Sequence, residues 1–117
     1  MLYTNLSHLM TAEQHNSAIG ENENVMIICG RMGPMCIPVY GIMELLEREY
    51  SHVKFYDMEF DNPEAHVIRN APECRNFMGI PFTMYYKNGK VVKATSSIQT
   101  MAQVRGILNE QFGEPSK

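Results

Sequence analysis

The stretch GIPFTMYYKNGKVVKA, at residues 79–94, places two runs of strand-forming residues on either side of a tight turn. Asn88-Gly89 supplies the two positive φ angles that a type I′ turn requires. The flanking runs are rich in β-branched and aromatic residues, which favour strands. An antiparallel hairpin is therefore predicted, with strands at residues 82–86 and 91–94.

A strand–helix–strand unit is predicted before this hairpin. Residues 25–29 read VMIIC and are closed by Gly30, a continuous apolar run that is typical of a strand buried on both faces. Apolar residues then recur at helical spacing up to about Tyr50, which predicts a long amphipathic helix. Residues 53–60 form a second strand, and the two strands should be parallel with a right-handed crossover between them.

Capping signals mark the remaining helices. Asn62 followed by Pro63 predicts a short helix over residues 64–70. An edge strand is expected near residues 3–6. Two capping boxes are expected to open a short first helix and a last helix, and these are Thr11 with Gln14 and Thr100 with Gln103. The order β-α-β-α-β-α-β-β-α predicts one α/β domain over residues 1–117, a mixed sheet of four to five strands with helices on both faces.

Composition excludes several classes of protein. The chain has 117 residues, 44% hydrophobic and 20% charged, an ordinary globular balance. Its net charge of −3 gives no electrostatic drive toward nucleic acid or anionic lipid, so neither is an expected partner. No apolar run approaches the roughly 20 residues of a membrane span, and no secretory signal is visible. Three cysteines are too few for a disulfide scaffold, so a cytoplasmic location is expected.

Two motifs resemble the thioredoxin family. Gly79-Ile80-Pro81 before a strand that ends in Lys87-Asn88-Gly89 is similar to the family's Gly-Ile-Pro-Thr strand and its Lys-Asn-Gly turn. Gly33-Pro34 follows the first buried strand as the family's Cys-Gly-Pro-Cys does. The resemblance runs from about Leu6 to Phe112. It implies the thioredoxin fold, a cis bond between Ile80 and Pro81 at the edge of the site, and thiol–disulfide exchange as the reaction class.

The sequence departs from that family at the site itself. Where the family has Trp-Cys-Gly-Pro-Cys, the chain reads RMGPM at residues 31–35, with Cys36 next. A thioether neither ionises nor attacks a disulfide, so exchange by residues 32 and 35 is excluded. The family's buried Asp falls on Met26. The resemblance implies that partners are bound by Met32, Gly33, Pro34, Met35, Ile80 and Pro81.

Cys36 is the expected nucleophile. Pro34 and Pro38 each suit the first position of a helix, so Cys36 should lie in the first turn or just before it. The free N–H groups there stabilise a thiolate. Cys29 ends a buried strand, where it is either a small core residue or the thiol that resolves a bridge with Cys36. Their spacing permits this disulfide without requiring it. Cys74 is expected to be a bystander or an intermolecular contact.

Asp57 leaves two interpretations open. It stands in the middle of a predicted strand, where a buried carboxylate would have a raised pKa and could accept a thiol proton. Alternatively it faces solvent, as Glu59 and Asp61 beside it are expected to do. The histidines have no metal-ligand spacing and are expected on the surface, at positions His8, His15, His52 and His66.

Three functions follow from these residues. The first is an atypical thiol–disulfide oxidoreductase that acts on protein or small disulfides through Cys36, with Cys29 as resolving thiol and Asp57 assisting. The second is a non-catalytic binding module that grips a peptide or protein partner beside Pro81. Neither needs a metal or a cofactor. Whether the chain is an enzyme stays open, because both of the family's cysteine positions hold Met. The third is a soft-metal carrier that would use Met32, Met35, Met78 and Cys36.

Overall fold

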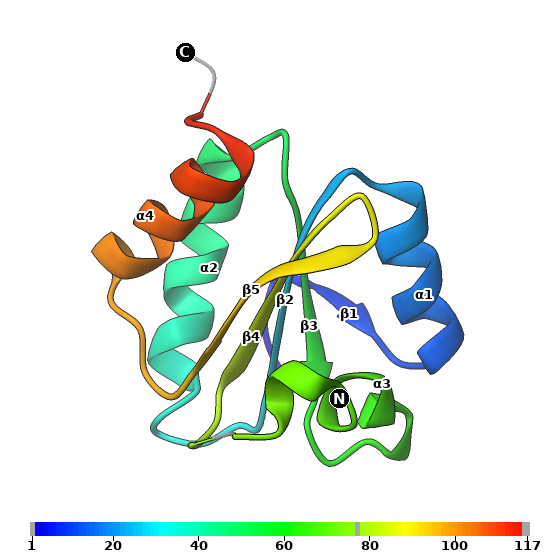
Figure 1. Cartoon of the computed structure of the whole chain (residues 1–117). Helices are drawn as coiled ribbons and strands as arrows, with labels where there is room; N and C mark the ends of the chain where they lie inside the picture. Colours follow the sequence, from blue (N-terminus) through cyan, green and yellow to red (C-terminus); the bar gives the residue numbers. More distant parts are fainter. Residues whose placement is uncertain (1, 77, 116–117) are drawn as a thin grey trace.

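Five strands form a mixed sheet, as predicted, and their order in the sheet is β1-β3-β2-β4-β5 (Figure 1). They are β1 (Ser7–Leu9), β2 (Asn24–Gly30), β3 (Lys54–Glu59), β4 (Phe82–Lys87) and β5 (Lys90–Ser96). β3 pairs in parallel with both β1 and β2, whereas β4 pairs antiparallel with β2 and β5. The structure is a computed structural model that describes residues 2–76 and 78–115.

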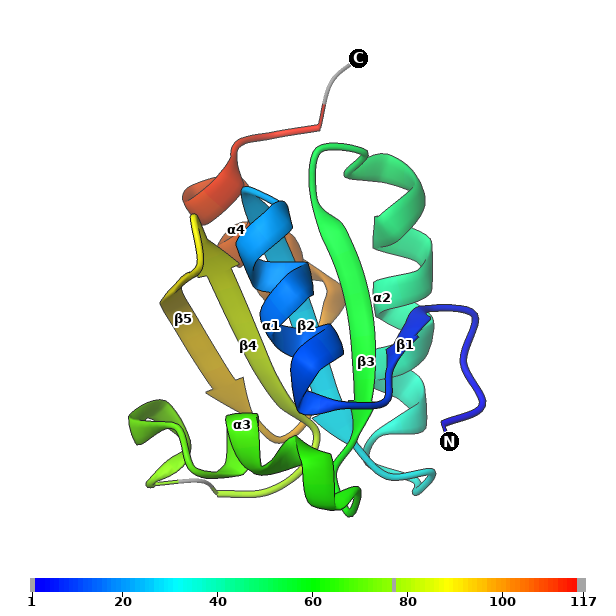
Figure 2. The same cartoon turned by 90° about the vertical axis from the view of Figure 1, so that its right-hand side faces the viewer.

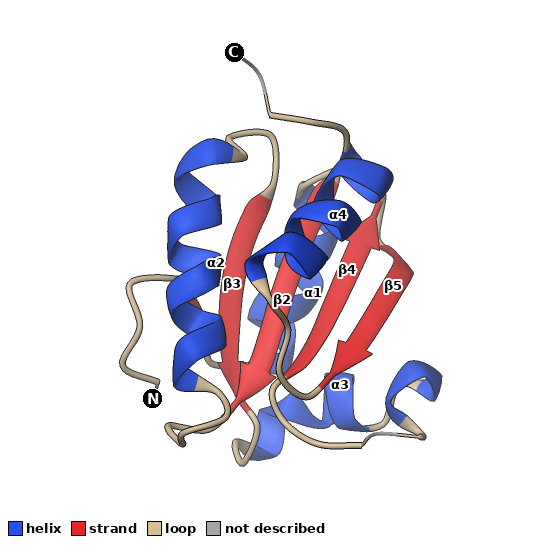
Figure 3. Cartoon of the chain, turned by 90° about the vertical axis from the view of Figure 1, so that its left-hand side faces the viewer, coloured by secondary structure: helices blue, strands red, loops and turns tan. Residues whose placement is uncertain are grey.

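Helices cover both faces of the sheet (Figure 3). They are α1 (Ala12–Glu21), α2 (Ile37–Glu49), α3 (His66–Arg69) and α4 (Met101–Phe112), with 3₁₀ turns at Pro63–Ala65 and Pro72–Cys74. One apolar core lies between the sheet and α2 with α4, and a second lies between the sheet and α1 with α3. None of the helices in the described residues has the length and apolar character to cross a membrane.

The local signals in the sequence are confirmed. Asn88 and Gly89 have φ angles of 53° and 79°, and β4 and β5 pair on either side of them. The Thr11 side chain accepts a hydrogen bond from the amide of Gln14, and Thr100 and Gln103 form a full capping box. These elements depend on residues close together in the chain, so the sequence alone predicts them.

The expected strand at residues 3–6 is wrong in position, because β1 begins only at Ser7. The hydroxyl of Thr4 accepts from the amide of Leu6 (3.0 Å), and Glu44 on α2 accepts from the amide of Asn5 (2.7 Å). Leu6 is buried in the core under α2. These contacts direct the N-terminal segment toward α2, so it cannot run beside β3 until Ser7.

Strand register places the loop after β2 beside the segment before β4. Cys29 is paired with Phe82 in the antiparallel ladder. Gly30, which follows Cys29, and Pro81, which precedes Phe82, therefore lie at the same end of the two strands. The loop that connects β2 to α2 leaves the sheet at this end (Figure 1). The residues that the sequence singled out at 32–36 and 80–81 therefore meet at one end of the sheet.

Candidate functional site

Cys36 occupies the N-cap of α2, just before the helix as expected. Its amide and that of Ile37 both donate to the carbonyl of Gly33, at 3.1 and 3.0 Å, which folds the loop into a tight turn. Pro38 stands in the first turn of the helix. The loop therefore delivers Cys36 to a helix N-terminus, but it also turns the side chain inward, where it is 1% exposed.

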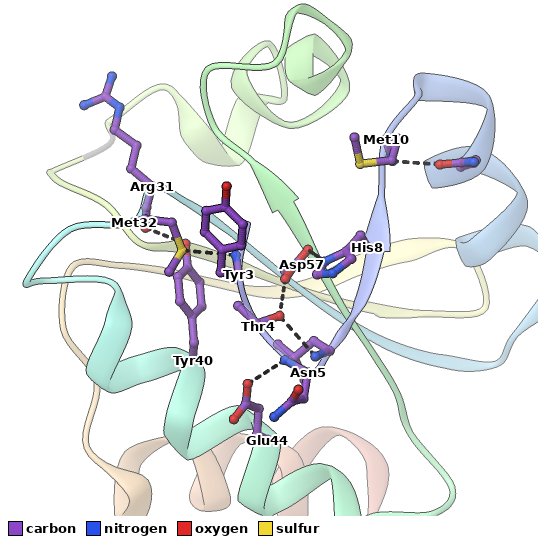
Figure 4. A network of polar contacts seen from close by, with 12 residues as sticks. Tyr3, Thr4, Asn5, His8, Met10, Arg31, Met32, Tyr40, Glu44 and Asp57 are labelled. Carbon is purple, nitrogen blue, oxygen red and sulfur yellow. Dashed lines mark hydrogen bonds and ion pairs between the residues drawn. The ribbon is translucent and has the colours of Figure 1, made fainter. Parts of the chain in front are cut away.

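The sulfur of Cys36 is enclosed by the end of β2. The amide of Arg31 donates to Sγ (3.5 Å), and the hydroxyl of Tyr40 donates to the carbonyl of Arg31 (2.9 Å; Figure 4). A Cβ added at Gly30 would stand 2.9 Å from Cys36 Sγ and 2.6 Å from the Tyr40 hydroxyl, closer than real side chains approach. A glycine at position 30 is therefore what leaves space for the thiol and the phenol together.

The guanidinium of Arg31 is paired with Asp61 at the surface. It forms two hydrogen bonds to the carboxylate of Asp61, at 2.7 and 2.8 Å, and lies over the ring of Phe60. The hydrogen bond from Arg31 lowers the pKa of Asp61. Arg31 thus donates to Cys36 through its backbone amide, while its guanidinium is paired with Asp61 at the surface.

Cys29 and Cys36 lie on opposite faces of the sheet. Cys29 is wholly buried in the core under α1 and α3, which it shares with Cys74, whereas Cys36 belongs to the core under α2 and α4. Burial raises the pKa of the Cys29 thiol to about 12, the direction that its apolar strand predicts. All three cysteines are free. A bridge between Cys29 and Cys36 would require the end of β2 to rotate.

The Ile80–Pro81 bond is cis, as expected. Pro81 is buried, and Ile80 is half-buried against the core that contains Cys36. The amide of Ser97 donates to the carbonyl of Gly79 (3.0 Å), which joins the segment before β4 to the segment after β5. This bond brings Met78 and Ile98 to the same end of the sheet as the loop of Met32.

Apolar side chains are unusually exposed at this end. Met32 is 39% exposed, Met35 45% and Met78 85%. Ile37 and Ile98 add to them. We call these five residues the methionine surface. Flexible thioethers at an exposed surface suit contact with apolar side chains of varied shape. Met32 and Met35 thus belong to an accessible surface, while the neighbouring thiol of Cys36 does not.

Asp57 is buried, and the solvent-facing interpretation is wrong. It is 1% exposed and faces α2, as Phe55 does two residues earlier. One oxygen accepts a hydrogen bond from the hydroxyl of Thr4, and the other lies 2.7 Å from His8 Nδ1 (Figure 4). Burial raises the pKa of Asp57, and the contacts with Thr4 and His8 oppose part of that rise. Both oxygens are thereby engaged by the N-terminal segment.

The sequence did not predict that Thr4 and His8 would contact Asp57, nor that His15 would be buried. His8 is half-buried beside Asp57 in the β1–β3 register. His15 on α1 is buried, and its Nε2 lies 3.0 Å from the hydroxyl of Tyr86. Burial lowers the pKa of His15. The expectation of surface histidines is wrong for His15, which shares the buried side of α1 with Ala18, three residues further along the helix.

The described residues bring no group of three or more His, Cys, Asp or Glu side chains together in a way that could hold a metal ion. A soft-metal site would have to depend on the thioethers of the methionine surface. Met32 Sδ already accepts a hydrogen bond from the amide of Tyr3 (3.4 Å; Figure 4). The geometry thus gives the soft-metal function no further support.

Solved structures share this architecture, although no protein-family model and no curated protein matches the sequence. A thioredoxin from Plasmodium falciparum superimposes with a TM-score of 0.77 at 18% identity, covering 91% of this chain and 99% of that one. A mutant thioredoxin from Halobacterium salinarum gives 0.76 at 15%, covering 95% and 93%. Oxidised thioredoxin O2 from Arabidopsis thaliana gives 0.75 at 11%, covering 95% and 97%. At these identities the likeness concerns the backbone, and the chain has the thioredoxin fold.

Proposed function

We propose that this chain is a non-catalytic binding module that holds a protein or peptide partner against the methionine surface beside Pro81. One observation carries the proposal: the accessible sulfur atoms at this end of the sheet are thioethers, whereas the three thiols are 0%, 1% and 7% exposed at Cys29, Cys36 and Cys74. A thioether can contact an apolar partner but cannot exchange disulfides. Binding is therefore the function that the exposed chemistry supports best.

The form of the surface suits an apolar, extended segment. Met32, Met35 and Ile37 come from the loop and first turn of α2, and Met78 with Ile98 come from the segments joined at Gly79 and Ser97. Pro81 stands just before β4, at the end of the sheet where the loop after β2 also lies. Unbranched thioethers adapt to different side chains at little cost, as promiscuous binding surfaces require.

Thiol–disulfide exchange through Cys36 is the second candidate. It is favoured by the position of Cys36 at the N-cap of α2 and by the amide of Arg31 that donates to its sulfur. The loop would have to open to expose Sγ. Cys29 could resolve a mixed disulfide only after the end of β2 had rotated, and Asp57 could act as a base only after releasing Thr4 or His8.

Reduction of insulin by dithiothreitol separates the two candidates. Under the binding proposal, the protein does not accelerate insulin precipitation above dithiothreitol alone, and Cys36→Ala changes nothing. A rate enhancement that Cys36→Ala abolishes would instead establish the second candidate. This assay depends only on thiol chemistry and leaves the methionine surface untouched.

Binding itself is measured on a random peptide array. Peptides rich in apolar residues should be retained by the native protein and lost by the double variant Met32→Glu with Met35→Glu. Leu45→Glu is the matched control, because Leu45 is 51% exposed on the outer face of α2. Equal losses in both variants would show that any exposed apolar residue is sufficient, and would contradict the proposal.

A further inference from the structure

The most exposed aromatic side chain in the described residues lies beside the methionine surface. Tyr3 is 82% exposed, whereas every other Phe and Tyr in residues 2–76 and 78–115 is buried or half-buried. Its backbone amide donates to Met32 Sδ (3.4 Å), and Figure 4 shows its ring next to the Met32 side chain. Tyr3 therefore extends the methionine surface from a segment 29 residues away in the sequence.

The backbone on either side of Tyr3 is held to the protein. Leu2 is 2% exposed in the core under α2, and the hydroxyl of Thr4 donates to the carboxylate of Asp57. A buried carboxylate is costly unless its oxygens are hydrogen-bonded, so the Thr4 contact is retained in the folded state. Figure 2 shows the chain before β1 passing beside α2 toward the loop that precedes this helix. Tyr3 is therefore presented from a fixed backbone beside that loop.

A ring held in this way suits recognition of a partner. An aromatic residue on a loose segment would lose backbone freedom on binding, and that loss reduces affinity. Because its backbone is already fixed, Tyr3 has only its side-chain torsions left to be ordered. Tyr is also enriched among the residues that carry most of the binding energy at interfaces. The methionine surface thus combines one rigid aromatic group with flexible thioethers.

Tyr3 and Met32 together favour an aromatic side chain in the partner. A thioether sulfur is attracted to an aromatic ring at a distance of about 5 Å, often at the ring edge. Two aromatic rings attract each other when they are offset or edge to face. An aliphatic side chain gains from burial at the same place but makes neither contact. This part of the surface can therefore distinguish aromatic from aliphatic side chains.

We propose that Tyr3 determines the specificity of the methionine surface, and that the partner is a peptide segment whose aromatic side chain packs against the Tyr3 ring and the Met32 thioether. The inference rests on the proposed binding function and names the class of its ligand. Leu2 and Thr4 are positioning residues, because they hold the backbone of Tyr3. The aromatic side chain of the partner is the anchor, and its apolar neighbours contact the remaining thioethers.

Two blocked, fluorescein-labelled peptides test this preference by fluorescence anisotropy. Each has leucines on both sides of a central residue, which is phenylalanine in one peptide and cyclohexylalanine in the other. The two side chains have the same carbon skeleton, but only phenylalanine has an aromatic ring. The phenylalanine peptide should bind about threefold to tenfold more tightly, the effect of one sulfur–aromatic or ring–ring contact. Equal affinity, or tighter binding of the cyclohexylalanine peptide, would overturn the proposal.

Variants locate the preference. Tyr3→Ala should weaken binding of the phenylalanine peptide at least tenfold and remove most of the difference between the two peptides, whereas Tyr3→Phe should retain it. Met10→Ala is the matched control, because Met10 is 39% exposed, as Met32 is, and should have no effect. Thr4→Val should weaken both peptides without changing their ratio, as expected for a positioning residue. An unchanged difference in Tyr3→Ala would overturn the role of Tyr3, and unchanged affinities in Thr4→Val would overturn that of Thr4.

The two proposals can fail separately. If Met32→Glu with Met35→Glu abolishes binding but the two peptides bind equally to the native protein, the binding function stands and the aromatic preference is overturned. If the double variant leaves binding unchanged, the proposed function fails, and the inference fails with it. Sedimentation velocity detects another occupant. Self-association that is lost in Tyr3→Ala would make a second copy the occupant, and would overturn the peptide.

Discussion

Replacing Gly30 with alanine should destabilise the protein by about 2–4 kcal/mol. The added methyl group would lie 2.9 Å from Cys36 Sγ and 2.6 Å from the Tyr40 hydroxyl, so both buried side chains must move. Overpacking of this kind costs about 1–3 kcal/mol. Displacement of Tyr40 also breaks its hydrogen bond to the carbonyl of Arg31, which adds about 0.5–1.5 kcal/mol.

The free energy of unfolding is measured by urea denaturation, together with Tyr40→Phe and the double variant. Tyr40→Phe removes the hydroxyl that the new methyl group would meet, so part of the cost is already absent in the double variant. The double variant should therefore be more stable than the sum of the single effects by about 1–2 kcal/mol. Displacement of Cys36 should also make the alkylation of this thiol faster in Gly30→Ala.

Gly33→Ala is the matched control in the same loop. A Cβ there meets nothing within 4 Å, so stability should be unchanged or raised by up to about 1 kcal/mol. If Gly30→Ala were no more destabilising than Gly33→Ala, or if the double variant were strictly additive, the packing of Cys36 and Tyr40 against Gly30 would be refuted.

Three further predictions concern buried titratable groups. Burial raises the pKa of Asp57, so the folded state binds this proton more tightly than the unfolded state does, and the part of the unfolding free energy due to Asp57 should fall as the pH rises from 3.8. Asp57→Asn should remove this pH dependence in urea denaturation. An unchanged pH dependence would contradict the burial of Asp57. Burial lowers the pKa of His15, so its contribution to the free energy of unfolding should be lost as the pH falls below 6.5. His15→Gln should flatten the plot of unfolding free energy against pH in that range. Parallel plots for the two proteins would contradict this prediction. Cys29, with a pKa of about 12 and no exposure, should be the last thiol that iodoacetamide alkylates in the native protein. Peptide mass mapping measures the order of labelling. Labelling of Cys29 before Cys36 would show that the end of β2 opens.

Local chemistry determined much of this protein from its sequence. The hairpin follows from Asn88-Gly89, the helix starts follow from Thr11 and Thr100, and the central strand follows from the apolar run at residues 25–29. Each depends on residues within a few positions of one another. The exclusion of exchange at residues 32 and 35 is likewise a matter of side-chain chemistry, which no fold can alter.

Contacts between distant segments decided the rest. Thr4 and Asp57 are 53 residues apart, and His15 and Tyr86 are 71 apart, so no local pattern reports that they meet. The position of β1 depends on the hydrogen bond of Asn5 to Glu44 and on the burial of Leu6 under α2, not on strand propensity. Cys29 and Cys36 bracket a short loop, yet the alternation of β2 sends Cys29 to one face while the turn at Gly33 returns Cys36 over the other. Spacing in sequence measures how far apart two residues can be, and only the packed structure decides which side of the sheet each one occupies.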